Sequence, residues 1–102
     1  MQETSLYFVS YDAEPLPGSE NFASCSGAAV NVWVSSCTEQ EALAVASRKV
    51  QEAGWRITTL GHIRRAVRSD YADAPEGLQY FEQAQQDGVV VVFHTWQDGV
   101  RH

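Results

Sequence analysis

The segment from Thr38 to Trp55, TEQEALAVASRKVQEAGW, predicts an amphipathic helix with both of its ends marked. We expect Thr38 to be the N-cap, because Glu41 follows three residues later at the capping-box spacing. Gly54 suits the left-handed position that ends a helix. One face carries apolar side chains at spacings of three and four, namely Leu43, Ala46, Val50 and Ala53, with Ala42 beside it. Because most of them are small, we expect the helix to lie close against a sheet.

A second helix is expected from Asp73 to Gly88, with Asp73 as N-cap, Pro75 in the first turn and Glu76 completing a capping box. Its apolar stripe is Leu78, Phe81 and Ala84. Alternating or continuous apolar runs predict strands. These strands are Ser5–Tyr11, Ala28–Ser36 and Val89–Trp96, the last an interior strand covered on both sides.

The stretch after the first helix has two interpretations. Trp55 to Leu60 reads as a strand, and Ile63 to Arg68 reads as a strand that returns through a turn at Gly61 and His62. The alternative is one long strand with a bulge at Gly61. Both remain open from the sequence.

The chain of 102 residues has the length of one domain, residues 1–102, with a long loop at 12–27 that is rich in Pro, Gly and Ser. The element order predicts an α+β fold of two layers. We expect a ferredoxin-like plait with an extra N-terminal strand and both helices on one face of the sheet.

Composition excludes several classes of protein. The net charge of −6 argues against binding to nucleic acid or to an anionic membrane. No apolar stretch approaches the length of a transmembrane helix, and the N-terminus has no signal-peptide pattern. Cys25 and Cys37 lack a C-x-x-C spacing, so we expect free thiols in a cytoplasmic protein.

A resemblance rests on four short motifs: Gly54-Trp55-Arg56-Ile57, Asp70-Tyr71, Tyr80–Ala84 with Asp87-Gly88, and Phe93-His94-Thr95-Trp96. Over roughly residues 28–97 the chain resembles a small group of uncharacterised bacterial α+β domains. That resemblance implies a fold and a bacterial setting. It implies no activity, so no catalytic or binding residue follows from it.

The candidate catalytic residues are His94 and Cys37. Cys37 precedes a helix N-terminus, where a thiolate is favoured, and a Cys37–His94 pair is the nucleophile hypothesis. His62, His94 and Cys37 offer metal-ligand chemistry, but no spacing forces them together. We therefore expect no metal and no cofactor.

Basic residues gather between positions 48 and 68. The candidate basic patch comprises Arg56, Arg64, Arg65 and Arg68, and the acidic residues Asp70, Asp73 and Glu76 follow it. One interpretation is local salt bridging along a charged edge strand. The other is a site for an acidic protein partner or an anion.

Alternation in Ala28–Ser36 points Val30, Val32 and Val34 toward the helices and Trp33 to the opposite face. Since Val89–Phe93 is apolar on both faces, that second face also needs cover. The loop, a second copy of the sheet, or a small molecule can supply it. We expect Trp33, His94 and Trp96 to form the binding surface on this open face.

Two functions follow from these expectations. The leading hypothesis is a non-enzymatic, homodimeric interaction or regulatory module joined through the sheet face that carries Trp33. The alternative is a small enzyme or ligand-binding protein that uses the same face around His94 and Trp33.

Overall fold

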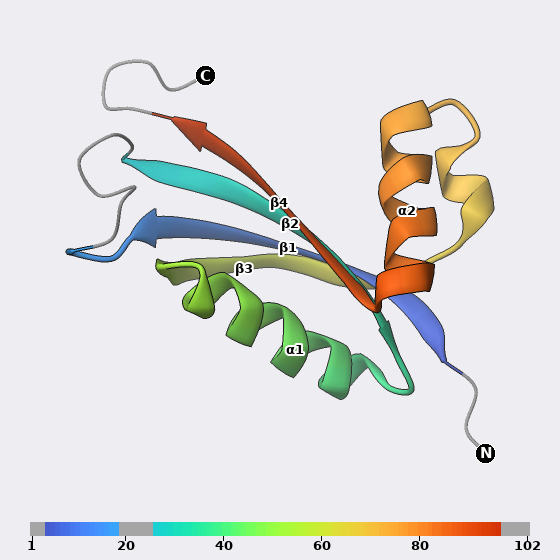
Figure 1. Ribbon diagram of the computed structural model, residues 1–102, viewed down its shortest axis with the longest axis horizontal. Coiled ribbons are helices and arrows are strands. Elements are labelled where there is room, and N and C mark those ends of the chain that lie inside the picture. The colour runs from blue at the N-terminus through green and yellow to red at the C-terminus, as the bar shows by residue number, and fades with distance from the viewer. Residues whose placement is uncertain (1–3, 19–25, 97–102) are drawn as a thin grey trace.

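The computed structural model describes residues 4–18 and 26–96, which form one four-stranded antiparallel sheet with a helix on each face (Figure 1). The strand order is β3-β1-β2-β4. Within these residues no helix is long and apolar enough to cross a membrane. The elements are β1 (Ser5–Pro15), β2 (Gly27–Ser36), α1 (Glu39–Glu52), β3 (Trp55–Ala66), the 3₁₀ helix η1 (Arg68–Tyr71), α2 (Pro75–Asp87) and β4 (Val89–Trp96).

The first strand lies in the middle of the sheet. β1 pairs antiparallel with β2 on one side and with β3 on the other, and β4 pairs antiparallel with β2. The α+β class is confirmed. The ferredoxin-like plait is not confirmed, because the N-terminal strand is central to the order instead of an addition to it. β4 is an edge strand, so its prediction as an interior strand is wrong.

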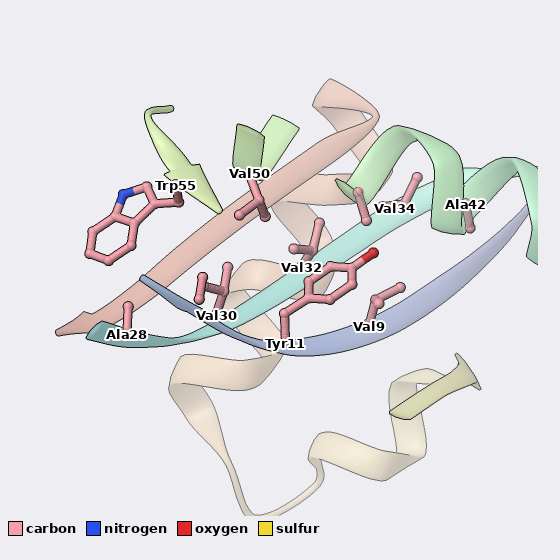
Figure 2. Packing of buried hydrophobic residues seen from close by; sticks show 11 residues of the cluster. Val9, Tyr11, Ala28, Val30, Val32, Val34, Ala42, Val50 and Trp55 are labelled. Atoms are coloured by element: carbon pink, nitrogen blue, oxygen red, sulfur yellow. The ribbon is translucent and has the colours of Figure 1, made fainter. Parts of the chain in front are cut away.

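The core beneath α1 is built mainly from valines and alanines (Figure 2). Val30, Val32 and Val34 of β2 are fully buried there against Ala42, Ala46 and Val50 of α1. The part of α1 that meets the strands is built from small residues, since Ala42 and Ala46 are fully buried there. Burial of each valine stabilises the fold by about 1.5–3 kcal/mol relative to exposure.

The second helix packs on the other face of the sheet, so the expectation that both helices share one face is wrong. Phe81 and Ala84 of α2 and Tyr71 of η1 are buried with Trp33, Leu6 and Ala66, which point away from α1. Figure 1 shows α2 at one end of the sheet, on the side away from α1. α2 packs on this face because β4 is apolar there too: its Val90 and Val92 pack against the cluster formed by Trp33, Tyr71 and Phe81.

The Thr38 cap and the Gly54 end of α1 agree with the prediction. The Glu41 backbone N–H donates to Thr38 Oγ1 at 3.1 Å, and Gly54 has a φ of +92° just beyond the helix. The Glu41 carboxylate accepts a hydrogen bond from the Ser36 hydroxyl at 3.3 Å. Ala53 is the C-cap and is exposed, so it does not extend the buried stripe.

The start of α2 differs from the prediction. Ala74 is the N-cap, whose methyl side chain accepts no backbone N–H, while Pro75 is the first helical residue. Asp73 is therefore not the cap. The acidic residue with a capping role is Asp70, whose carboxylate accepts the Val67 N–H at 3.0 Å at the start of η1.

β3 is one long strand with an irregularity at Gly61, so the bulge interpretation is confirmed and the hairpin is wrong. His62 lies opposite Ser10 and Leu60 lies opposite Tyr11, which leaves Gly61 as the extra residue. β1 likewise continues to Pro15. The connection to β2 is therefore shorter than the predicted loop at 12–27, and its residues 19–25 lie outside the described part of the chain.

Candidate functional site

The face of the sheet that meets α2 divides into a covered half and an uncovered half. In the covered half Trp33 is only 5% exposed, and its Nε1 donates to the Tyr71 hydroxyl at 2.7 Å. The rings of Phe8 and Tyr80 each lie 5.1 Å from the Trp33 ring, centroid to centroid. Trp33 thus belongs to the core, which corrects the expectation of an open face around it.

Polar side chains occupy the uncovered half. Residues directly opposite in antiparallel strands point to the same face, as do residues two apart along a strand. From Trp33 the register therefore places Asn31, Ser10 and His62 in one row across the sheet. The next row holds Asp12, Ala29 and His94. We call the five polar residues the polar shelf: Ser10, Asp12, Asn31, His62 and His94.

The best-defined contact on the polar shelf joins β1 to β3. Ser10 Oγ lies 3.1 Å from His62 Nδ1 and accepts the His62 backbone N–H at 3.2 Å. Since that N–H occupies one lone pair, the hydroxyl proton remains free to point at the ring nitrogen. The His62 ring also packs 5.4 Å from Phe8.

The bulge at Gly61 makes this contact possible. A Cβ at position 61 would lie 2.4 Å from Ser10 Oγ and 3.1 Å from the Ser10 carbonyl oxygen. Only glycine therefore lets the backbone of β3 approach the Ser10 hydroxyl this closely. The pair presents an imidazole and a hydroxyl side by side at the surface, which is a hydrogen-bonding arrangement and a minimal proton-transfer pair.

Sequence reasoning missed the Ser10–His62 pair. The available signal was the alternation in β1, where Ser10 and Asp12 stand in phase with Phe8. The partner strand was not known in advance, because β1 pairs with a strand about fifty residues away. The bulge also shifts the register by one residue, which decides whether His62 faces Ser10.

The structure does not bring the predicted chemical residues together. His94 is exposed opposite Ala29, near one end of β2, whereas Cys37 is a half-buried free thiol just past the other end. Their separation along β2 is roughly 25 Å at the rise of a strand. Across the sheet, three strand spacings, about 14 Å, separate His62 from His94, which also lies one row further along the strands. No group of three metal-ligating residues exists within residues 4–18 and 26–96.

Two of the residues singled out from the sequence lie partly or wholly outside the described part of the chain. The backbone of Trp96 pairs with Gly27, but its side chain lies outside the described part of the chain. Cys25 also lies outside the described residues.

The predicted basic patch is largely ion-paired. Arg64 bonds Asp70 at 3.0 Å, Arg68 bonds Glu82 at 2.9 Å, and Arg56 pairs with Glu14. The backbone N–H of Val67 is the main cause that lowers the pKa of Asp70, and Arg64 adds to the effect. Arg65 takes part in no ion pair among the described residues. The prediction of an acidic partner now depends on Arg65.

The two edges of the sheet differ in charge. β3 carries Arg56, Arg64 and Arg65 and is bent by two register irregularities, near Gly61 and near Thr58. β4, with the sequence VVVVFHTW, carries no Asp, Glu, Lys or Arg. Charges and bulges protect an edge from pairing with another strand, whereas a regular apolar edge invites it.

Comparisons of this chain with protein-family models, with curated proteins and with solved structures found no match.

Proposed function

We propose that the chain is a cytoplasmic, non-enzymatic interaction module that binds an extended strand along the free edge of β4. The single observation that carries this proposal is the uncharged, regular edge of β4, to which no described strand is paired on its outer side. Addition of a strand at a sheet edge is a common mode of protein recognition.

The hydrogen-bond ladder identifies the backbone groups that a partner strand would meet. The Ser35 N–H donates to the Gly88 carbonyl at 2.8 Å, which extends the β2–β4 ladder by one pair. Because these bonds alternate along an antiparallel strand, Val90, Val92 and His94 also point their backbone groups at β2. The residues whose backbone N–H and C=O groups point outward, away from β2, are therefore Val89, Val91, Phe93 and Thr95. We call these four the outward residues.

These four residues provide a regular docking edge. Each new backbone hydrogen bond contributes about 0.5–1.5 kcal/mol net, so a strand that fills the edge gains several kcal/mol before the cost of ordering it. The β4 side chains are only partly buried as far as Phe93, so an added strand would also bury more of their apolar surface. The β3 edge offers no equivalent, because its arginines and bulges interrupt it.

The test uses a soluble peptide with the β4 sequence, residues 88–96, flanked by lysines. We expect the peptide to slow amide hydrogen exchange at Val89, Val91, Phe93 and Thr95, while the already bonded Val90 and Val92 change little. NMR-detected exchange with and without the peptide measures both sets. Equal protection of β3 amides would contradict the assignment to β4.

A matched pair of variants controls for charge and for exposure. Thr95→Lys places a lysine at an exposed position on the β4 edge, and Thr59→Lys makes the same change on the β3 edge. We expect Thr95→Lys to weaken peptide binding about tenfold and Thr59→Lys to leave it unchanged. Equal effects of the two variants would show that the peptide binds by charge alone.

A second candidate function is supported by the Ser10–His62 pair. An exposed imidazole held by a hydroxyl beside Asn31 provides hydrogen-bonding groups for a small polar molecule on the polar shelf. A fragment screen by NMR tests it: hits should shift Ser10, Asn31 and His62 and disappear in His62→Ala. Hits that shift no polar-shelf residue would exclude this candidate.

A further inference from the structure

The geometry points to a second copy of this chain as the strand that β4 binds, with a two-fold axis perpendicular to the sheet at Val92. This inference rests on the proposed function, since it names the occupant of the same edge. An antiparallel pair of identical strands is self-complementary, so one edge satisfies both partners. The result is a continuous eight-stranded sheet.

The position of the axis follows from the ladder. Outward-pointing residues must pair with outward-pointing residues, so the axis must lie at a residue of β4 and not between two residues. An axis at Val92 pairs Val89 with Thr95 of the second copy and Val91 with Phe93 of the second copy. All four outward residues are then used on both chains. An axis at Val91 or at Phe93 leaves at least one of them without a partner inside β4.

The side chains that meet in this register are compatible. On the α1 face Phe93 meets Val91 of the second copy, and an aromatic beside a β-branched residue is a favourable cross-strand pair. On the α2 face Val92 meets its own copy and His94 meets Val90. No Asp, Glu, Lys or Arg of β4 enters the contact.

The charge of the chain favours this edge over other routes to a dimer. Each copy carries a net charge of −6, so association of two copies is opposed by long-range repulsion. Because β4 carries no charged side chain, a contact between two β4 strands brings no like charges directly together. We therefore expect added salt to strengthen the dimer by screening, whereas a dimer held by ion pairs would weaken.

Cross-linking tests the register directly. In the background Cys25→Ser/Cys37→Ser, Val92→Cys would place two cysteines opposite each other in a non-hydrogen-bonded pair. The Cα atoms of such a pair are about 4.5 Å apart, within the range that a disulfide spans. Val90→Cys is the matched control, because Val90 lies opposite His94 of the second copy and not opposite itself. We expect Val92→Cys to form a covalent dimer at least tenfold faster than Val90→Cys, and Val90→Cys/His94→Cys to cross-link again.

The second part of the test uses the chain with its natural β4 sequence. Light scattering measures its oligomeric state, and hydrogen exchange measures the protection of its β4 amides. We expect a dimer whose Val89, Val91, Phe93 and Thr95 amides become protected as concentration rises. A monomer at several hundred micromolar that still binds the β4 peptide overturns the second-copy inference and leaves strand addition standing. Failure of both the dimer and the peptide overturns both. A dimer in which Val90→Cys cross-links faster than Val92→Cys overturns the register.

Discussion

The two faces of the sheet are packed by different means. The α1 face is mainly a layer of valines and alanines beneath a helix that lies along the strands, with Tyr11 and Trp55 as its large buried side chains. The α2 face is packed at one end only, by a cluster of aromatic rings around Trp33, and its other half carries the polar shelf. Neighbouring residues of the same strand, Val32 and Trp33, therefore belong to different cores.

This difference in packing means that residues of the α1 face are constrained by the fold, whereas half of the α2 face is not. The α1 face extends over all four strands, so its residues define the position of each strand in the sheet. The α2 face confines its apolar contacts to a few large side chains, which leaves half of the surface for polar groups. Single substitutions on the two faces should therefore differ in how much unfolding free energy they cost and in how many elements lose amide protection.

The largest effect is expected at Trp33. Trp33→Ala removes a buried indole and leaves the Tyr71 hydroxyl without its 2.7 Å partner, so we expect the free energy of unfolding to fall by about 3–5 kcal/mol. Chemical denaturation measures the loss. Trp33→Phe is the control, because it retains a ring and should lose less. A smaller loss at Trp33 than at Val32 would break the comparison between the faces.

Val32→Ala tests the opposite face at the adjacent residue. Val32 is fully buried, so loss of two methyl groups should cost about 2–3 kcal/mol including the cavity term. Because α1 covers all of the strands, we expect amide protection to fall across the sheet, whereas Trp33→Ala should act mainly on α2 and η1. Hydrogen exchange distinguishes a local from a general loss of protection.

Gly61→Ala tests the uncovered half. The added methyl group would meet Ser10 Oγ, and we expect a cost of about 1–2 kcal/mol from the forced displacement. Ser10→Ala in the same chain should recover part of it, because the oxygen at 2.4 Å is gone while the Ser10 carbonyl oxygen at 3.1 Å remains. A double-mutant cycle by denaturation gives the coupling. Strictly additive losses would show that the bulge does not depend on Ser10.

The smallest effect concerns Asp70 and pH. Its pKa is lower in the folded chain than in the unfolded chain, chiefly because the carboxylate accepts the Val67 N–H. The carboxylate therefore stabilises the fold above its unfolded pKa, and this stabilisation is lost as the pH falls through the folded pKa. The denaturation midpoint should therefore fall slightly as the pH is lowered, and we expect this decrease to be smaller in Asp70→Asn. An unchanged pH profile would contradict the role of Asp70 at η1.

Local pattern was enough to predict most of the elements. The Thr38 cap, the Gly54 end of α1 and the valines that face it follow from contacts within a few residues, which sequence spacing encodes. The face chosen by α2 was not predictable in this way. It depends on the place of β4 at the far edge of the sheet, and strand order is a property of pairing between distant segments.

The candidate site shows the same division. The outward position of Trp33 relative to α1 followed from alternation, but its cover by α2 did not. The Ser10–His62 pair needed both the β1–β3 pairing and the one-residue shift at Gly61, neither of which a periodic pattern specifies. The free edge of β4 was hidden from sequence reasoning because an apolar run is equally typical of a central strand.

The strand order also governs how the chain is made. Among the described strands, β1 and β2 are the only sheet neighbours that follow each other along the chain, so they can pair early in synthesis. The other side of β2 waits for β4, more than fifty residues later, which is roughly 3–10 s of translation. During that interval the nascent chain presents the alternating valines of β2 as an open edge, and a β4 strand from a neighbouring chain that has not yet paired its own β2 matches that edge as well as its own does. Crowded ribosomes on one message would therefore favour strand exchange between chains.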